Sequence, residues 1–351
     1  MVSRERAVGS IERKEIDRIP FDIVFCASPL EKMKRHLSVQ TEEEVLQILK
    51  SDFRHYSPEY LGKPETLSDG NKLSFWGVPH KSEMTENGEI CGISGYPLKE
   101  MKSIDEMEDW PLWPDPEMFD YKKMKKEISE KTDEFAIICG ANCFFFTCQA
   151  LRGIDTFLMD LYINPEIAQY IINKVVGFYV RQTEIITEKM GEMIDIMPIF
   201  DDYGTQESSM VSVDVFDKYF KEPSRKIAEI ARTKNIRIMQ HSCGAVKAFI
   251  PKFIEYGAEL LDPIQVTAKN MVPAELRKEF GKELCFHGGI DTQYLLPNGT
   301  EQEIKQAVIN TINAFYDRGG YILCASQDIQ IDIPPQNCVA MADVSLRVIP
   351  S

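Results

Sequence analysis

Hydrophobic and polar residues along this chain follow two alternating patterns. Short apolar runs of strand type recur at residues 21–25, 135–138, 194–200, 236–239, 260–265, 284–287 and 321–323. Stretches of helical character separate them at residues 4–16, 41–50, 121–131, 165–190, 213–234, 273–280 and 300–318, and a closing helix begins at Pro335. Repeated strand–helix units of this kind predict a parallel sheet with right-handed crossovers.

The alternation is interrupted once, between Gly62 and Asp115. Glycine, proline and polar residues are scattered through this stretch, which we interpret as an irregular excursion with a short hairpin on one rim of the fold. No internal repeat or low-complexity linker divides the chain, and 351 residues is a length that one (β/α)₈ barrel can take. The sequence therefore predicts an α/β protein with a single (β/α)₈ TIM barrel domain over residues 1–351.

Composition and charge narrow the classes of function. The formal net charge of −15 argues against nucleic acid or an anionic membrane surface as a partner. No apolar run approaches the roughly eighteen residues that a membrane helix requires. The nine cysteines show no framework spacing, which indicates free or metal-bound thiols in a reducing compartment. Residues 1–6 lead into a charged helix, so we expect no signal peptide and a cytoplasmic protein.

The segment Gln240-His241-Ser242-Cys243-Gly244 carries the clearest candidate chemistry, because it ends the strand expected at residues 236–239. Strand ends before helices are where α/β folds place their active groups. His241 and Cys243 point the same way on an extended backbone, and zinc accepts this mixture of nitrogen and sulfur ligands. We expect Cys324, at the end of the strand expected at 321–323, to be the third ligand. The alternative for these cysteines is a role as small buried hydrophobes.

Other strand ends carry polar residues with less specific signals. Asp201 and Asp202 follow the strand expected at 194–200, and one of them could act in acid–base catalysis or bind zinc, or it could cap a helix. Our candidates for substrate contacts are Cys26, Trp76, Asn142, Tyr203, Gln206, Gln265 and Gln327. Cys26 is also an alternative zinc ligand, and a core position is an equally good interpretation of Trp76. His287 is expected near the barrel mouth as a packed, hydrogen-bonded residue.

These residues and several short segments resemble the uroporphyrinogen decarboxylase superfamily. The resemblance extends from Asp17-Arg18-Ile19-Pro20 to about Pro334-Pro335, and its most specific segments are His241-Ser242-Cys243-Gly244, Asp262-Pro263-Ile264-Gln265, Gly288-Gly289-Ile290-Asp291-Thr292-Gln293 and Gly319-Gly320-Tyr321. The superfamily implies a (β/α)₈ barrel with its site at the C-terminal mouth.

Two branches of this superfamily make different predictions. The decarboxylases carry an arginine-rich segment after the first strand, where this chain reads Cys26-Ala27-Ser28-Pro29-Leu30, and a closing-strand histidine, where it reads Ser326-Gln327-Asp328. Porphyrinogen decarboxylation is therefore disfavoured. The other branch comprises zinc-dependent methyltransferases that work with corrinoid proteins, and its His-x-Cys…Cys ligands match His241, Cys243 and Cys324.

The resemblance to the second branch implies a function. We expect a zinc-dependent methyltransferase that moves a methyl group from a small methoxylated or similar donor to the Co(I) centre of a corrinoid protein. The sequence has no Asp-x-His-x-x-Gly segment, so the corrinoid (cobalamin) is expected on a separate protein that docks at the barrel mouth. The alternatives are a methyltransferase that methylates a thiol from methyl-cobalt and, less favoured, a porphyrinogen decarboxylase or a non-catalytic zinc-binding barrel. An oligomer is possible.

Overall fold

A curled parallel sheet forms the centre of the molecule. The computed structural model describes residues 1–62, 66–68, 70–86, 88–316 and 318–346. Seven strands pair in the order β1-β5-β6-β7-β8-β9-β10, all in parallel. Their bounds are β1 Phe53–Tyr56, β5 Ala136–Cys139, β6 Ile196–Phe200, β7 Arg237–His241, β8 Leu260–Ile264, β9 Cys285–Ile290 and β10 Tyr321–Ala325. The predicted barrel class is confirmed, with a regular ladder that stays open between β1 and β10.

An irregular segment occupies the space between these two edge strands. Residues 21–25, predicted as a strand, form only isolated bridges to the β10 side, Phe21 with Leu323 and Phe25 with Ile329. On the β1 side, Asp52 donates its backbone N–H to the carbonyl of Phe21 over 2.8 Å. The eighth position of the barrel is therefore filled by hydrogen-bonded chain without a full strand.

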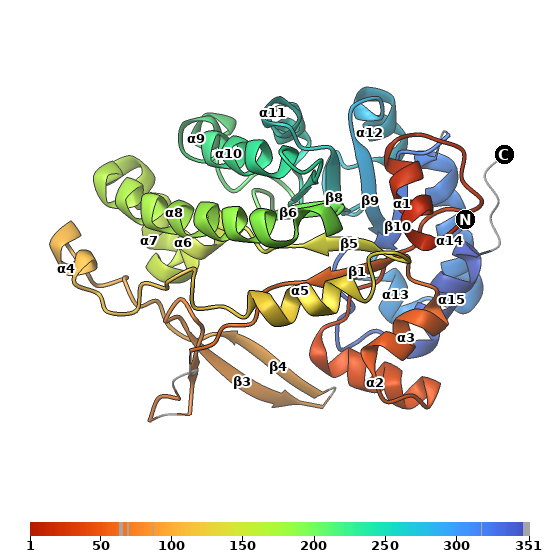
Figure 1. Ribbon diagram of the computed structural model, residues 1–351, viewed down its shortest axis with the longest axis horizontal. Helices are drawn as coiled ribbons and strands as arrows, with labels where there is room; N and C mark the ends of the chain where they lie inside the picture. The colour runs from red at the N-terminus through yellow and green to blue at the C-terminus, as the bar shows by residue number, and fades with distance from the viewer. Residues whose placement is uncertain (63–65, 69, 87, 317, 347–351) are drawn as a thin grey trace.

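Helices surround the sheet, and they alternate with its strands along the chain (Figure 1). Their bounds are α1 Ser3–Ile11, α2 Ala27–Leu37, α3 Glu42–Leu49, α4 Ile104–Glu108, α5 Tyr121–Ser129, α6 Phe144–Arg152, α7 Ile154–Ile163, α8 Pro165–Met190, α9 Val213–Tyr219, α10 Lys221–Arg232, α11 Ile250–Tyr256, α12 Pro273–Phe280, α13 Leu295–Asn298, α14 Glu301–Phe315 and α15 Pro335–Ser345, with 3₁₀ turns η1 Gly191–Met193 and η2 Lys247–Phe249. None of the described helices is long and apolar enough to cross a membrane.

The predicted excursion is a small antiparallel sheet that projects from the barrel (Figure 1). Its strands β2 Lys72–Leu73, β3 Pro79–Thr85 and β4 Gly88–Ile93 pair in that order. Most of β3 and β4 is exposed, so little apolar surface fixes this sheet against the barrel. The hairpin that the glycine-rich pattern predicted is confirmed.

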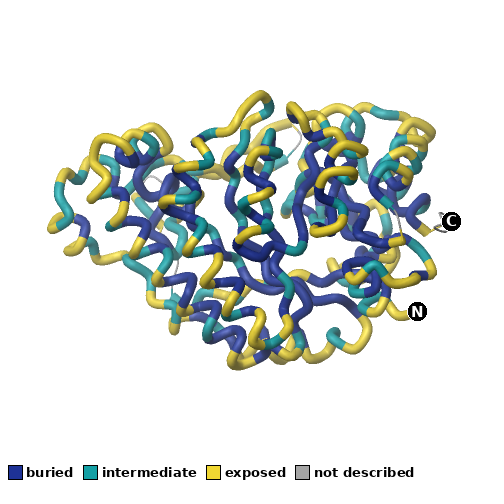
Figure 2. The backbone as a smooth tube through the Cα atoms, turned by 90° about the horizontal axis from the view of Figure 1, so that it is seen from above, coloured by how far each residue is buried: buried dark blue, intermediate teal, exposed yellow. Residues whose placement is uncertain are grey.

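The barrel interior is filled at its N-terminal end. One buried cluster joins the inward-facing residues near the strand starts, which are Phe53, Ala136, Ile138, Ile196, Met239, Leu260, Cys285 and Ile322. Ala7 and Ile11 of α1 belong to the same cluster, so α1 closes this end. Figure 2 shows the strands dark blue in the centre and the exposed positions on the outer turns. Open space for a ligand is therefore left at the C-terminal mouth.

The sequence pattern missed strand β1 and misjudged two helices. β1 contains Arg54, whose guanidinium is buried against the Phe135 ring and donates to Glu43, so the strand lacks an apolar alternation. The helix expected to reach residue 16 ends at Ile11, because Arg13 adopts φ 55°. The helix expected over 213–234 is two helices that meet at Phe220.

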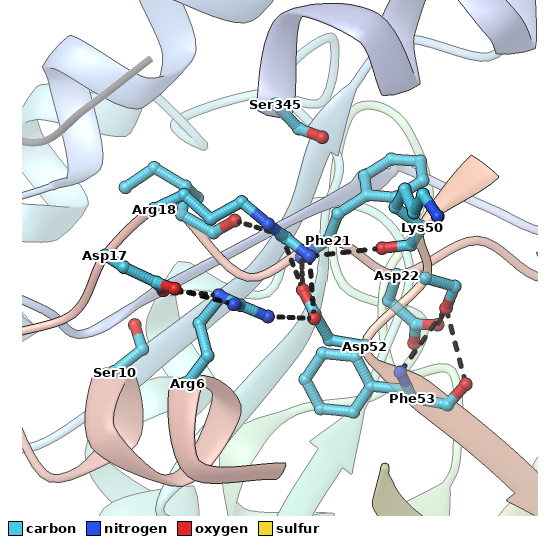
Figure 3. A network of polar contacts seen from close by, with 12 residues as sticks. Arg6, Ser10, Asp17, Arg18, Phe21, Asp22, Lys50, Asp52, Phe53 and Ser345 are labelled. Atoms are coloured by element: carbon cyan, nitrogen blue, oxygen red, sulfur yellow. Dashed lines mark hydrogen bonds and ion pairs between the residues drawn. The ribbon is translucent and has the colours of Figure 1, made fainter. Parts of the chain in front are cut away.

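A charged network ties the irregular segment to β1 (Figure 3). Asp52 is fully buried, and its carboxylate accepts hydrogen bonds from Arg6 and Arg18 at 2.7 Å and from the backbone N–H of Phe21 at 2.9 Å. Two guanidinium partners offset the desolvation of the buried carboxylate. The network holds Asp22, which follows Phe21, beside β1.

Replacement of Glu43 by glutamine is expected to lower stability at neutral pH. Its carboxylate contacts Arg54 at 2.9 Å and Lys131 at 3.1 Å. Burial would raise the pKa of Glu43, but these cations outweigh it and lower the pKa to about 2. Because that pKa lies below the unfolded value, the contribution is present above about pH 4.5 and disappears as the pH falls through 2. We expect Glu43→Gln to cost about 1–2 kcal/mol in urea unfolding at pH 7.

The exposed neighbour Glu42 provides the control for this prediction, because Glu42→Gln removes a similar charge without these two contacts. It should leave the free energy of unfolding nearly unchanged. A cost of Glu43→Gln that is undiminished at pH 2 would contradict the assignment.

Candidate metal centre and substrate cavity

A layer of polar side chains lies directly above the apolar floor of the barrel. Successive inward-facing positions of a strand are two residues apart. Each member of this layer follows a member of the buried floor cluster by two residues, and the layer consists of His55, His241, Asp262, His287 and Cys324. The alternation that builds the core thus also places ionisable groups at the mouth.

Four of these side chains join Asp22 in a continuous hydrogen-bonded chain across the mouth. His55 Nε2 lies 2.8 Å from Asp22 Oδ2, which lies 3.2 Å from His287 Nε2. His287 Nδ1 lies 2.5 Å from one oxygen of Asp262, and His241 Nδ1 lies 2.6 Å from the other. Imidazoles and carboxylates alternate, so each buried charge has an opposite neighbour.

Burial and charge act in opposite directions on the pKa values of this chain. Burial alone would lower the pKa of His287, but Asp262 and Asp22 raise it to about 10. Burial would also lower the pKa of His241, but the charge of Asp262 opposes it, and the pKa is raised well above its usual value. For Asp262, burial is outweighed by His287 and His241, and its pKa is lowered. A metal at His241 Nε2 would therefore displace a proton, which makes metal affinity depend on pH.

His241, Cys243 and Asp202 bring three ligand-type atoms together at the rim, all within 4.8 Å of one another. His241 Nε2 lies 3.6 Å from Cys243 Sγ and 3.7 Å from Asp202 Oδ1. Tetrahedral zinc with bonds of about 2.1 Å to nitrogen and 2.3 Å to sulfur separates those two ligands by about 3.6 Å. Asp262 holds Nδ1 and leaves Nε2 for the metal, an arrangement typical of zinc-bound histidine. These residues fit a zinc ion.

The loops that carry Asp202 and Cys243 are held together by their backbones. Cys243 donates its backbone N–H to Asp202 Oδ1 over 2.7 Å. Gly244 has φ +85°, and a Cβ there would lie 2.6 Å from the carbonyl carbon of Gly204. Glycine is required at Gly244 both for this conformation and for the close approach.

Cys324 lines the barrel mouth together with His241, but its sulfur lies closer to other ligand-type atoms. Its sulfur forms a second group within 4.8 Å with Asp22 and His287, and no such group among the described residues joins it to His241 and Cys243. Asp22 and His287 already hydrogen-bond each other, so the second group is satisfied without a metal. Burial raises the pKa of the Cys324 thiol well above its usual value. Cys324 as third zinc ligand remains a prediction, and Asp202 is the alternative that the geometry offers.

The two candidate catalytic aspartates occupy different environments. Asp201 is fully buried and accepts the backbone N–H groups of Phe144 at 3.1 Å and Phe146 at 3.0 Å, at the start of α6. Burial raises the pKa of Asp201 to about 8, although these hydrogen bonds oppose it. These contacts agree with the alternative interpretation of Asp201 as a helix cap. Asp202 lies at the rim, so it is the aspartate that can reach a substrate or a metal.

Three of the candidate substrate contacts lie at the mouth. Gln265 accepts the backbone N–H of Gly244 at 2.7 Å, and the amide nitrogen of Gln327 lies 3.3 Å from Cys243 Sγ. Gln206 lines the outer part of the mouth together with these two residues. All three side chains are therefore close enough to the candidate ligands to contact a substrate.

The other four candidates do not line the two mouth cavities. Trp76 is buried against Phe178 and donates to Tyr179, and Tyr203 stacks between Phe145 and Phe249. The side-chain amide of Asn142 is held by Pro198 and Thr183, whereas Cys26 accepts a hydrogen bond from Gln330 at the start of α2. Their contacts are those of core and loop residues.

Two cavities meet at the mouth. The inner one has a volume of about 390 Å³ and includes His55, His241, His287, Cys324 and Gln327 in its lining. The outer one, about 710 Å³, includes Asp202, Cys243 and Gln265, and Gln327 lines both cavities. The inner volume suits a ligand built on one ring.

Sequence reasoning missed two residues of the site and assigned no role to a third. His55 lies on the strand that was not recognised, and Asp22 lies in the middle of an apolar run. Asp262 was visible in a family segment without an assigned role. The period of two could have found it, because Asp262 follows Leu260, a residue of the apolar floor, by two positions on β8.

The fold and the site define an α/β barrel with a candidate metal centre at its C-terminal mouth. Residues 94–347 match the family model described as uroporphyrinogen decarboxylase (URO-D), which is more than half of the chain. The chain belongs to this family. The resemblance found in the sequence is thereby confirmed.

Comparison with solved structures supports the fold. A methyltransferase from Methanosarcina mazei superimposes with a TM-score of 0.68 at 14% identity, over 98% of both chains. A B12-independent methionine synthase from Shewanella sp. W3-18-1 matches with a TM-score of 0.43 at 12% identity, over 76% of this chain and 72% of that chain. No curated protein matches the sequence.

Proposed function

We propose that this protein is a zinc-dependent methyltransferase that moves a methyl group from a small methoxylated donor to the Co(I) centre of a separate corrinoid protein. The observation that carries the proposal is the His241–Cys243 pair, with ligand atoms 3.6 Å apart, beside a ring-sized cavity. Family membership supports an enzymatic role, and a fold shared along its full length with a methyltransferase agrees with methyl transfer.

The residues of the site have separate tasks in this reaction. Zinc, when held by His241, Cys243 and a third ligand, supplies a Lewis acid for the leaving oxygen of the donor. Asp262 fixes the imidazole of His241 through Nδ1, and the Gln327 amide donates to the sulfur of Cys243. Apolar residues on β6 and β7 line the inner cavity beside His241 and exclude water from it; they are Pro198, Phe200 and Met239.

The cavity lining also separates this proposal from porphyrinogen decarboxylation. Among the described residues that line the two mouth cavities, none is lysine or arginine. A substrate crowded with carboxylates requires such cations. The structure therefore agrees with the sequence in disfavouring that reaction.

A substrate screen with reduced cobalamin tests the function, with cobalt methylation followed by absorbance. We expect methylation from a methoxylated compound. Transfer to a cognate corrinoid protein should be faster than transfer to free cobalamin by about a hundredfold or more, because docking replaces a chance encounter by a positioned one. Equal rates of transfer to the corrinoid protein and to free cobalamin at matched concentration would contradict the proposed protein partner.

Two other outcomes of the screen would support the alternatives. Demethylation of methylcobalamin by an added thiol, without transfer from any methoxylated compound, would support the thiol-methylating reaction. Zinc-loaded protein that is inactive in both directions would support a non-catalytic barrel.

A further inference from the structure

The inner cavity has an unusual balance of charge. It is lined by three imidazoles and by the carboxylates of Asp262 and Asp328, and no lysine or arginine lines it within the described part of the chain. Each imidazole is hydrogen-bonded to a carboxylate: His55 to Asp22, His287 to Asp22 and Asp262, and His241 to Asp262. Three imidazoles thus share the two carboxylates of Asp22 and Asp262, so once zinc occupies Nε2 of His241 the charges of the other two imidazoles, His55 and His287, are matched.

Asp328 is the exception, because the structure shows no ion pair or hydrogen bond for its carboxylate among the described residues. It follows Gln327 just beyond β10, is exposed, and lines the inner cavity. Its backbone N–H donates to the side chain of Gln327 over 3.0 Å, which holds its position in the chain. Burial and the charge of Asp262 raise the pKa of Asp328, and the charges of His241 and His55 oppose this rise without outweighing it.

The route into the site is acidic as well. Asp202 and Asp332 line the outer cavity, and Gln327 lines both cavities. A zinc ion held by the imidazole of His241, the thiolate of Cys243 and one further anionic ligand adds no net charge. With His55 and His287 matched by Asp22 and Asp262, the carboxylates of Asp328 and Asp332 give the zinc-loaded site a net negative charge.

An apolar wall lines the inner cavity beside His241. It comprises Ile138, Pro198, Phe200 and Met239. The Phe200 ring lies 5.2 Å from the His241 ring, centroid to centroid, so an aromatic face borders the candidate metal ligand. This wall suits a ring but offers no group that could bind a carboxylate.

We propose that the inner cavity takes a ring-sized methyl donor without negative charge, and that Asp328 is a residue that determines this specificity. The inference rests on the proposed function for the identity of the reaction. It goes further by naming the charge class of the donor and the side chain that selects it. An anionic donor would meet Asp328 without a compensating cation, whereas an uncharged or cationic one would not be repelled.

Three compounds of matched shape test the charge class: 3-methoxybenzyl alcohol, 3-methoxybenzoate and 3-methoxybenzylamine. Dissociation constants are measured by calorimetry with the zinc-loaded protein at low salt and in the absence of corrinoid. We expect the benzoate to bind at least tenfold more weakly than the alcohol, and the amine to bind as well as the alcohol or better. Added salt should reduce the difference.

Asp328→Asn tests the residue, with Asp332→Asn on the outer cavity as the matched control. We expect Asp328→Asn to reduce the alcohol-to-benzoate ratio about fivefold or more, whereas Asp332→Asn should change it less than twofold. Benzoate binding equal to that of the alcohol, an unchanged ratio in Asp328→Asn, or no binding of any of the three would overturn the proposal. The expected binding order without cobalt methylation would contradict the proposed function alone.

Discussion

Cys243→Ala is expected to remove most of the zinc and nearly all methyl transfer while leaving the barrel folded. The protein should hold about one zinc per chain, and the loss of one thiolate from a three-ligand site removes a large share of the binding free energy. A Lewis acid contributes several kcal/mol to the stabilisation of the transition state, so the rate should fall by about 10²–10⁴. Zinc content by mass spectrometry and the cobalt assay measure both effects. Cys139→Ala is the control, since Cys139 is equally a thiol but is buried in β5 with its sulfur beside Met124.

The third ligand is resolved by two further variants. Cys324→Ala should lose zinc and activity if the sequence prediction holds. If Cys324→Ala keeps both and Asp202→Asn loses both, the rim group of Asp202, His241 and Cys243 is the metal site, and the prediction for Cys324 is wrong. If Cys243→Ala retained its full zinc content, Cys243 would not be a zinc ligand and the proposed metal centre would be wrong.

Asp262→Asn is expected to damage stability and metal binding together. The amide keeps the shape but leaves two histidines without their shared charge, and breaking a buried ion pair costs about 3–5 kcal/mol. Zinc affinity should fall by about 10–100-fold, because the orientation of His241 depends on Asp262. Chemical unfolding of the metal-free protein and competition with a zinc chelator give the two quantities separately.

The stability cost of Asp262→Asn depends on pH with a defined sign. The folded pKa of Asp262 is lowered, so its contribution is present above about pH 4 and disappears as the pH falls towards the folded value. The pKa of His287 is raised to about 10, so its share is complete below about pH 6.5 and is lost as the pH rises through 10. The cost of Asp262→Asn should therefore be largest between about pH 4 and 6.5 and should fall as the pH rises towards 10.

Asp195→Asn is the control, because Asp195 is a buried carboxylate paired with Arg4 near the opposite end of the barrel. It should destabilise the protein without changing zinc affinity. An Asp262→Asn protein with wild-type stability and zinc affinity would show that the hydrogen-bonded chain has no energetic role.

Much of the fold could be predicted from the sequence because apolar strands and amphipathic helices alternate clearly in its second half. The helices at Pro165–Met190 and Pro273–Phe280 lie at their predicted bounds. β1 could not be recognised, since the buried charge of Arg54 is compensated by Glu43 and Phe135, whose proximity no local pattern reveals. Asp22 was hidden in the same way, because its imidazole partners come from other strands.

The candidate site could likewise be predicted from the sequence only in part. Cys243 follows His241, the last residue of β7, by two positions, so local geometry alone predicts that they converge. Convergence across the barrel depends on register and side-chain direction, which is why the sequence could not distinguish Cys324 from Asp202 as the third ligand. Asp201 and Asp202 are adjacent in the chain, yet only Asp202 lines a mouth cavity, because successive side chains take different directions.

The packing of α1 against the start of β10 has a consequence for how the protein folds during synthesis. Ser10 accepts the backbone N–H of Gly320 and donates its hydroxyl to the carbonyl of Tyr321, 311 positions away. A ribosome therefore releases these partners of α1 only after 311 further positions have been translated. Until then Ala7 and Ile11 lack part of their burial, and closing so long a loop costs entropy before the contacts form. The barrel therefore closes late relative to the synthesis of α1, and until then the nascent chain presents this apolar surface to chaperones.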